Sequence, residues 1–297
     1  GEGVAWTFDA PNRRLIFTGE TFENFLTKGN AYLWRRIQDV DDNKMTQRVG
    51  DGPTNTGSEE PFRELLHFEE ESDLLYVAWL DPENPDSRYA FWDYRDGTSK
   101  LQIEVPLRVP SPVDEGLAQM VVALQGYTDL LEGDDHQVVA KLNGVPIGEV
   151  SWDGLAAAEL VADFDQGLLR ADGDNTLTLE GSEAGQLLVS VEIAYDRQPV
   201  ADDDQLWLRD VAGGVQSVSG FTGSEIMVVE SPTGDAVVRQ DINVYASGDG
   251  WAVAFEAAPG SDYVIAETGS LHEPVIDASA SAGLRSSENE ADYLIIA

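Results

Sequence analysis

A chain of 297 residues is long enough for two or three domains, each with its own core. Its 55 acidic residues against 18 lysines and arginines give a formal net charge of −37, which excludes nucleic acids and anionic membranes as partners because both would repel it. The absence of cysteine excludes disulfides and a thiol nucleophile within the chain, and no apolar run approaches the roughly 20 residues needed to span a bilayer. With only four lysines, the acidic surface fits either a halophilic protein or an ordinary acidic secreted protein, and we keep both interpretations.

Residues 1–73 are predicted to form an N-terminal region of β hairpins and a loop. The short apolar segments Val4–Phe8 and Arg14–Phe17 are separated by a turn sequence and predict a hairpin. The polar stretch from 39 to 60 is typical of an exposed loop. His67 has no neighbouring histidine or cysteine, so we expect a structural role for it rather than metal binding.

Residues 74–198 are predicted to form a jelly-roll-like β-sandwich. The run Leu74–Leu80 is fully apolar, residues 100–109 alternate apolar and polar side chains, and residues 120–126 form an inner strand. Together with the segments described next, they give about eight strands, a number typical of such a sandwich.

The second half of this sandwich is organised around Asn143 and Gly144. Residues 136–142 alternate as a half-buried strand, and the Asn-Gly pair predicts a type I′ turn because both central residues of that turn need a positive φ. Residues 145–150 should therefore pair back as the next strand. A linker of small residues follows, then a second turn over 168–175, and then strands that include 176–179 and 187–193.

Two sets of residues in the sandwich are candidate binding sites. The densest aromatic cluster predicts either a carbohydrate-binding platform or core packing, and consists of Tyr89, Phe91, Trp92 and Tyr94. The candidate calcium ligands are Asp172 and Asp174, with Asp134 and Asp135 as an alternative pair. Aspartates beside glycines also simply form turns, so both roles stay open.

The last third of the chain predicts a smaller Ig-like β domain over residues 205–285, after a polar linker at 196–204. Residues 290–297 differ from all earlier segments because the run 291–297 has the pattern of a strand buried on both faces of a parallel sheet. We expect this run to be the first strand of a missing domain. Its proposed interaction residues are Tyr293, Leu294, Ile295 and Ile296.

Three stretches together resemble the β-rich region that precedes the catalytic domain of gingipain-like secreted cysteine peptidases. They are residues 142–154 with 173–179, residues 215–221 leading to 226–229, and residues 290–296. The resemblance implies that the Asp-Tyr-Leu-Ile-Ile strand opens a caspase-like α/β domain, whose catalytic histidine and cysteine lie downstream. No catalytic residue can be carried over to this chain, although the parent protein would be a cysteine peptidase.

The leading functional hypothesis is a non-catalytic extracellular or cell-surface β module that shields, positions or anchors the peptidase part of the same precursor. One alternative is a carbohydrate-binding module with glycans as ligands. Another is a structural subunit of a cell-surface assembly, joined to neighbouring subunits by strand addition. Hydrolysis by this chain alone is not expected, because it has neither cysteine nor a Gly-x-Ser-x-Gly motif.

Overall fold

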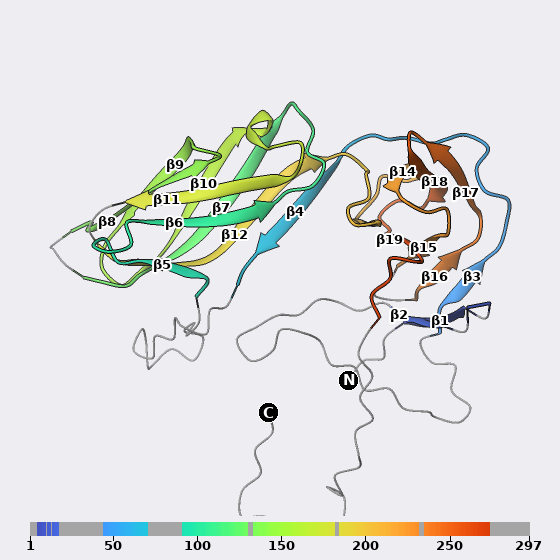
Figure 1. Cartoon of the computed structure of the whole chain (residues 1–297), viewed down its shortest axis with the longest axis horizontal. Helices are drawn as coiled ribbons and strands as arrows, with labels where there is room; N and C mark the ends of the chain where they lie inside the picture. The colour runs from blue at the N-terminus through green and yellow to red at the C-terminus, as the bar shows by residue number, and fades with distance from the viewer. Residues whose placement is uncertain are drawn as a thin grey trace, which may run out of the picture.

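The computed structural model describes residues 5–9, 11–12, 14–17, 44–70, 91–129, 133–181, 184–231 and 235–273. These residues form nineteen β-strands and one short 3-10 helix, η1 (Gln166–Leu168), arranged in two lobes (Figure 1). The predicted all-β fold class with a β-sandwich is therefore confirmed. Within the described ranges, no helix has the length and apolarity to cross a membrane.

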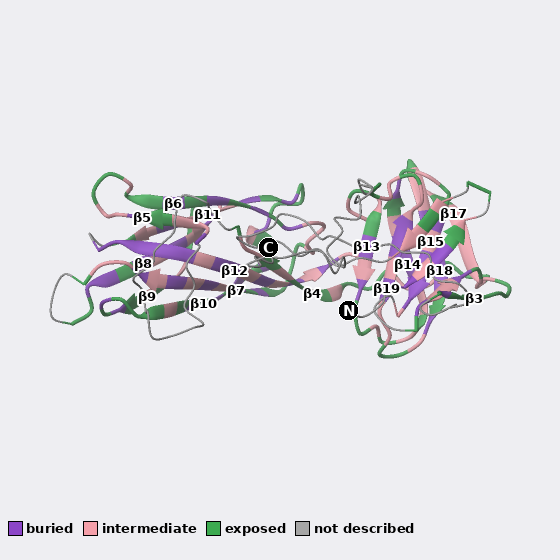
Figure 2. Cartoon of the chain, turned by 90° about the horizontal axis from the view of Figure 1, so that it is seen from below, coloured by how far each residue is buried: buried purple, intermediate pink, exposed green. Residues whose placement is uncertain are grey.

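The first lobe is a sandwich of two antiparallel sheets. One sheet has the order β10 (Ala157–Asp165), β7 (Leu117–Gly126), β12 (Gln186–Arg197) and β4 (Phe62–Phe68), and β5 (Asp93–Arg95) also pairs with β12. The other sheet has the order β6 (Gln102–Arg108), β11 (Asp174–Gly181), β8 (His136–Leu142) and β9 (Val145–Trp152). Buried and exposed segments alternate along many of these strands (Figure 2).

Alternating side chains build the core between the two sheets. In β6, Ile103, Val105 and Leu107 are buried while the residues between them face solvent, because successive side chains of a strand point to opposite faces. Full burial of each such aliphatic side chain contributes roughly 1.5–3 kcal/mol. The same pattern in β7, β8, β11 and β12 completes one continuous cluster.

The turn at Asn143 and Gly144 has the predicted type I′ geometry. Their φ angles are 51° and 84°, and β8 and β9 pair on either side of them, so this prediction is confirmed. The Asn143 side chain also donates to the Leu168 carbonyl and to Asn175 Oδ1, both at 2.8 Å, and its Oδ1 accepts from the Thr176 amide at 3.0 Å. The turn is therefore fixed to the start of β11.

Two strands of this lobe differ from the sequence prediction. The stretch between Gly154 and Leu168 was predicted to be a linker, which is wrong, because it contains β10. Alanines obscure the alternation there, although Leu160 and Phe164 are buried in the core. β4 pairs with β12, so the sandwich includes a strand that begins at Phe62, N-terminal to the predicted boundary at residue 74.

The second lobe also consists of two sheets. One has the order β13 (Gln205–Leu208), β19 (Tyr263–Glu267), β15 (Ile226–Glu230), β16 (Val237–Arg239) and β3 (Thr46–Arg48), and the other has the order β14 (Gly214–Phe221), β18 (Gly250–Ala257) and β17 (Ile242–Ser247). β3 runs parallel to β16. A second core, which includes Phe221, Phe255 and Tyr263, fills this lobe.

The N-terminal strands are divided between the two lobes. β1 (Trp6–Asp9) and β2 (Arg14–Phe17) form the predicted hairpin. The hairpin is held near the second lobe, where Arg14 Nη1 donates to the Thr268 carbonyl at 3.0 Å. β3 belongs to the second lobe and β4 to the sandwich, so the chain enters the sandwich, forms it, and then returns to the second lobe.

Several predicted features lie outside the described residues. They are the apolar strand Leu74–Leu80, the aromatic residue Tyr89, and the C-terminal run with Tyr293, Leu294, Ile295 and Ile296.

Candidate functional site

The two chain segments that cross between the lobes are both attached to the same strand edge. Residues 49–61 connect β3 to β4, and residues 198–204 connect β12 to β13. Ser58 pairs in parallel with Gln216 of β14, and Val200 pairs in parallel with Ser219 of the same strand. Backbone hydrogen bonds of 2.8–3.1 Å hold both segments there. Each crossing is therefore built into the second lobe as an added piece of strand.

A buried ion pair fastens the second crossing to the sandwich. Arg197 Nη1, at the end of β12, lies 2.7 Å from Glu64 Oε2 on the neighbouring strand β4, and the side chains are only 6% and 16% exposed. Arg197 Nη2 also donates to the Val200 carbonyl at 3.1 Å, so one guanidinium joins β4 to the crossing segment. Such a charge-assisted arrangement fixes orientation as well as contributing attraction.

Tyr195 contributes to the same network from β12. Its hydroxyl donates to the Pro110 carbonyl at 2.8 Å and lies 3.4 Å from Glu64 Oε2. Burial, and then the negative charge of Glu64, raise the pKa of Tyr195, so the hydroxyl stays protonated and acts as a donor at neutral pH. Tyr195 thereby ties the end of β12 to the chain that follows β6.

A second, more exposed ion pair lies beside the first. Arg108, at the end of β6, forms a two-pronged contact with Asp202 of the crossing segment: Nε donates to Oδ2 at 3.1 Å, and Nη2 donates to Oδ1. The hydrogen bond and charge of Asp202 raise the pKa of Arg108. Because this pair is open to solvent, salt screens it more than it screens the Glu64–Arg197 pair.

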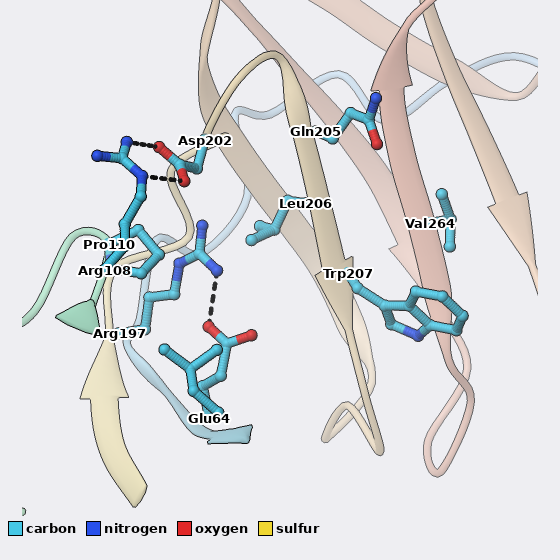
Figure 3. A pocket seen from close by; sticks show the side chains of 10 residues that line it. Glu64, Arg108, Pro110, Arg197, Asp202, Gln205, Leu206, Trp207 and Val264 are labelled. Atoms are coloured by element: carbon cyan, nitrogen blue, oxygen red, sulfur yellow. Dashed lines mark hydrogen bonds and ion pairs between the residues drawn. The ribbon is translucent and has the colours of Figure 1, made fainter. Parts of the chain in front are cut away.

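These residues form one wall of a cleft of about 350 Å³ between the lobes (Figure 3). The opposite wall comes from β13 and β19 of the second lobe. The lining residues are Glu64, Leu66, Arg108, Pro110, Arg197, Asp202, Gln205, Leu206, Trp207 and Val264. The charged members are two acids and two arginines, already paired with each other, so the lining is balanced in charge although the chain as a whole is strongly acidic.

Two N–H donors of residues that line the cleft have no hydrogen-bond acceptor among the described residues. They are Nε of Arg197 and Nε1 of Trp207, and both atoms are buried. The Arg209 guanidinium lies 4.4 Å from the centre of the Trp207 ring and holds the indole by a cation–π contact. A buried donor without an acceptor costs about 1–3 kcal/mol. An acceptor oxygen that reached either donor would therefore stabilise the structure.

The three described rings of the predicted aromatic cluster, Phe91, Trp92 and Tyr94, differ in their surroundings. Phe91 is only 2% exposed and packs with Leu187 in a small apolar cluster, and Trp92 packs against the sandwich core. Tyr94 is 36% exposed, with Lys100 Nζ 4.9 Å from the centre of its ring. Tyr94 is therefore the one described ring of this cluster with a substantial exposed surface on which a sugar could stack.

The predicted calcium ligands lie at opposite ends of one sheet. Asp172 and Asp174 precede or begin β11, whereas Asp134 and Asp135 precede its antiparallel neighbour β8. Asp172 Oδ1 accepts from the Asp174 amide at 3.1 Å, and Asp135 Oδ1 accepts from the Gly154 amide at 2.9 Å. Among the described residues, no group of three or more acidic, histidine or cysteine side chains could hold a metal ion. The bond from Asp174 to Asp172 is that of a local turn, whereas Asp135 is buried and joins a residue 19 positions away in the chain. Calcium binding stays a prediction.

The two histidines of the sandwich have separate surroundings. His67 is exposed on β4 and lies 3.0 Å from Glu69 and 3.2 Å from Glu192. His136 is buried, stacks on Trp152 with ring centroids 4.6 Å apart, and contacts the Thr128 carbonyl through Nε2 at 2.9 Å. None of these four contacts is with a side-chain hydroxyl or thiol, so these histidines have the surroundings of structural side chains.

Sequence reasoning did not identify the cleft. Glu64 and Arg197 are 133 residues apart, and nothing in their local patterns indicates that they meet. One weak signal exists: Arg108 and Arg197 each stand at the end of a strand that leads toward a proline.

No model of a known protein family matches the chain, and no curated protein matches it. Among solved structures, dimeric latent PorU from Porphyromonas gingivalis is similar over 90% of this chain, with a TM-score of 0.54 and 13% identity. This chain spans about a quarter of the PorU chain, 25%. The comparison shows a shared fold that extends over both lobes.

A CBM36-1 domain of a multidomain xylanase from the hindgut metagenome of Trinervitermes trinervoides matches 44% of this chain and 96% of its own length. Its TM-score is 0.28 and its identity 10%.

Proposed function

We propose that this chain is a non-catalytic extracellular β module of a gingipain-like cysteine peptidase precursor, and that its two lobes position the peptidase part. The observation that carries the proposal is the match to PorU. A fold shared over 90% of this chain makes up only 25% of that protein, so there the two lobes belong to a much longer chain. The three sequence stretches that resemble the region before a gingipain-like catalytic domain support the same assignment.

The junction between the lobes supports a positioning role. A module that positions another domain must transmit a fixed geometry, and flexible connections between domains are the usual expectation. Here both crossings are paired with β14, and a buried ion pair ties the second crossing to β4. The two lobes would therefore act as one rigid spacer rather than as two domains that move independently.

The chemistry of the described residues supports a non-catalytic role. The chain contains no cysteine, so a cysteine peptidase would have to take its nucleophile from another part of the precursor. His67 and His136 contact carboxylates, a backbone carbonyl and an indole ring rather than a nucleophile.

Immunoprecipitation from the native source tests this proposal. An antibody raised against the sandwich lobe would be used to isolate the native protein, followed by intact-mass measurement and a peptidase assay with and without a thiol-alkylating reagent. We expect a mass well above 32.3 kDa, or a stable complex, with peptidase activity that the reagent abolishes. A 32.3 kDa species that carries no larger partner and no thiol-dependent activity would refute the proposal.

A further inference from the structure

We infer that the cleft between β4 and β13 binds an extended, uncharged polypeptide segment, which adds as a strand to the edge of β13 beside Trp207. This inference rests on the proposed function, because the peptidase part would supply the segment. The binding surface is defined by Leu66, Pro110, Leu206, Trp207 and Val264.

The edge of β13 faces the cleft. Gln205, Leu206 and Trp207 all line it, although successive side chains of a strand point to opposite faces. A cleft that meets three consecutive residues borders the edge of the strand rather than one of its faces. Figure 3 agrees, since Leu206 points toward the Glu64–Arg197 side while Trp207 lies on the other side, with Val264. Among the described strands, β13 pairs with β19 alone.

The backbone of Trp207 is the part of this edge that can accept a partner strand. The Asp204 carbonyl accepts from the Glu267 amide, so the even-numbered residues of β13 bond toward β19. The N–H and C=O of Gln205 point the other way and are both bonded to Asp202. By the same alternation, the N–H and C=O of Trp207 point into the cleft, where no described strand pairs with them.

A peptide backbone supplies hydrogen-bond acceptors for two buried donors of residues that line the cleft. Trp207 Nε1 and Arg197 Nε are buried donors to which no residue in the described part of the chain supplies an acceptor, and Arg197 is 5% exposed. An extended segment brings a carbonyl oxygen with every residue, and strand addition uses main-chain hydrogen bonds for affinity. Alternate side chains of the added strand would lie against Leu66 and Leu206 on one face and against Trp207 and Val264 on the other.

The charges of the cleft favour an uncharged segment. Glu64 is paired with Arg197, and Asp202 is paired with Arg108, so a segment that carried a charge into the cleft would find no unpaired partner among the lining residues. Burying an unpaired charge is strongly unfavourable. The strongly acidic remainder of the chain would also repel an acidic segment.

The test uses the full chain and a fluorescein-labelled peptide, Ser-Thr-Val-Tyr-Val-Thr-Ser, in fluorescence anisotropy at 0.5 M NaCl. Two further peptides carry N-methyl groups on one or the other set of alternate residues, which removes backbone donors without changing side chains. In strand addition only one set of donors faces β13, so we expect one N-methylated peptide to bind about tenfold more weakly and the other to bind like the parent. Equal binding of all three peptides, equal weakening by both sets, or no binding of the parent would overturn the inference.

Variants of the chain locate the site. Trp207→Ala should weaken binding of the parent peptide by about tenfold, whereas Leu155→Ala, at an exposed position of the sandwich, should leave it unchanged. Circular dichroism of each variant would establish that it is folded, and the N-methyl comparison needs no variant at all. Unchanged binding by folded Trp207→Ala would place the peptide elsewhere and refute the site. A precursor with peptidase activity but without peptide binding to this chain would leave the proposed function standing.

Discussion

Glu64 and Arg197 meet at 2.7 Å where the sandwich gives way to the second lobe, and both side chains are largely buried. The Arg197 guanidinium touches both β4, an edge strand of the sandwich, and the segment that crosses to β13. We expect the arrangement of the lobes and the shape of the cleft to depend on this contact.

Glu64→Ala should destabilise the chain by about 3–5 kcal/mol, because it leaves the Arg197 charge buried without its carboxylate. Chemical denaturation, monitored by circular dichroism, measures the loss. Glu192→Ala is the matched control, since Glu192 pairs with His67 at an exposed position of the same sheet. A loss for Glu64→Ala no greater than that for the control would show that the buried pair is dispensable.

Salt should stabilise the fold. A net charge of −37 repels itself, and the screening length falls from about 10 Å at 0.1 M salt to about 3 Å at 1 M. We expect the thermal midpoint to rise equally in sodium chloride and potassium chloride, because screening depends on ionic strength and not on the cation. A midpoint that stays level or falls between low and molar salt would contradict this explanation.

Gly144→Ala should cost about 1–2 kcal/mol through backbone strain alone. Gly144 has φ of 84°, which L-residues adopt at a cost, and no atom of the described residues lies within 4 Å of the added Cβ.

Asn143→Ala should cost more than Gly144→Ala, because it also removes the side-chain hydrogen bonds to Leu168, Asn175 and Thr176. Urea unfolding would compare both with Val145→Thr at the adjacent exposed position. The reverse order of the two losses would argue against the anchoring role of Asn143.

Asp96 should make stability depend on pH at the acidic end. The Ser99 hydroxyl and then the backbone amides of Lys100, Thr98 and Ser99 donate to its carboxylate and hold the pKa of Asp96 well below its usual value. Because the folded-state pKa is the lower one, this stabilisation is present above the ordinary aspartate pKa of about 3.9 and is lost as the pH falls through the folded-state pKa.

Thermal midpoints between pH 2 and pH 7 check the role of Asp96. Asp96→Asn should lower the midpoint at pH 7 and show a shallower decline below about pH 4 than the unsubstituted chain. Asp163→Asn, on the exposed face of β10, serves as the control. Parallel profiles for the Asp96→Asn variant and the unsubstituted chain would show that the hydrogen bonds to Asp96 are not linked to folding.

The parts of the fold that could be predicted from sequence are those set by neighbouring residues. The type I′ turn at Asn143 and Gly144 and the strict alternation in β6 are local signals, and both predictions match the structure. β10 was missed because its alanines are weakly apolar, and β3 because its three residues, Thr46–Arg48, are exposed and pair with residues near Val237. Sequence pattern carries little information about pairing over such distances.

The cleft could not be predicted for the same reason. Arg197, Asp202 and Trp207 lie close together in the chain, but the partners that make them a site are Glu64, Arg108 and Val264. The sequence indicated candidate binding residues by their residue type alone. Aromatic rings such as Phe91 then proved to be packing residues, and aspartates such as Asp172 proved to be in turns, because both residue types serve structure more often than binding.

The distance distribution between the lobes tests the central claim, that the two lobes form one fixed module. The chain has no cysteine, so spin labels can be attached specifically at Val161→Cys on the sandwich and Glu256→Cys on the second lobe. Pulsed electron paramagnetic resonance then measures the distance between the two labels. Val161→Cys with Val145→Cys, both within the sandwich, gives the width that label motion alone produces. We predict a single interlobe distance with a width equal to that of this control; a broad or multiple interlobe distribution would contradict the claim.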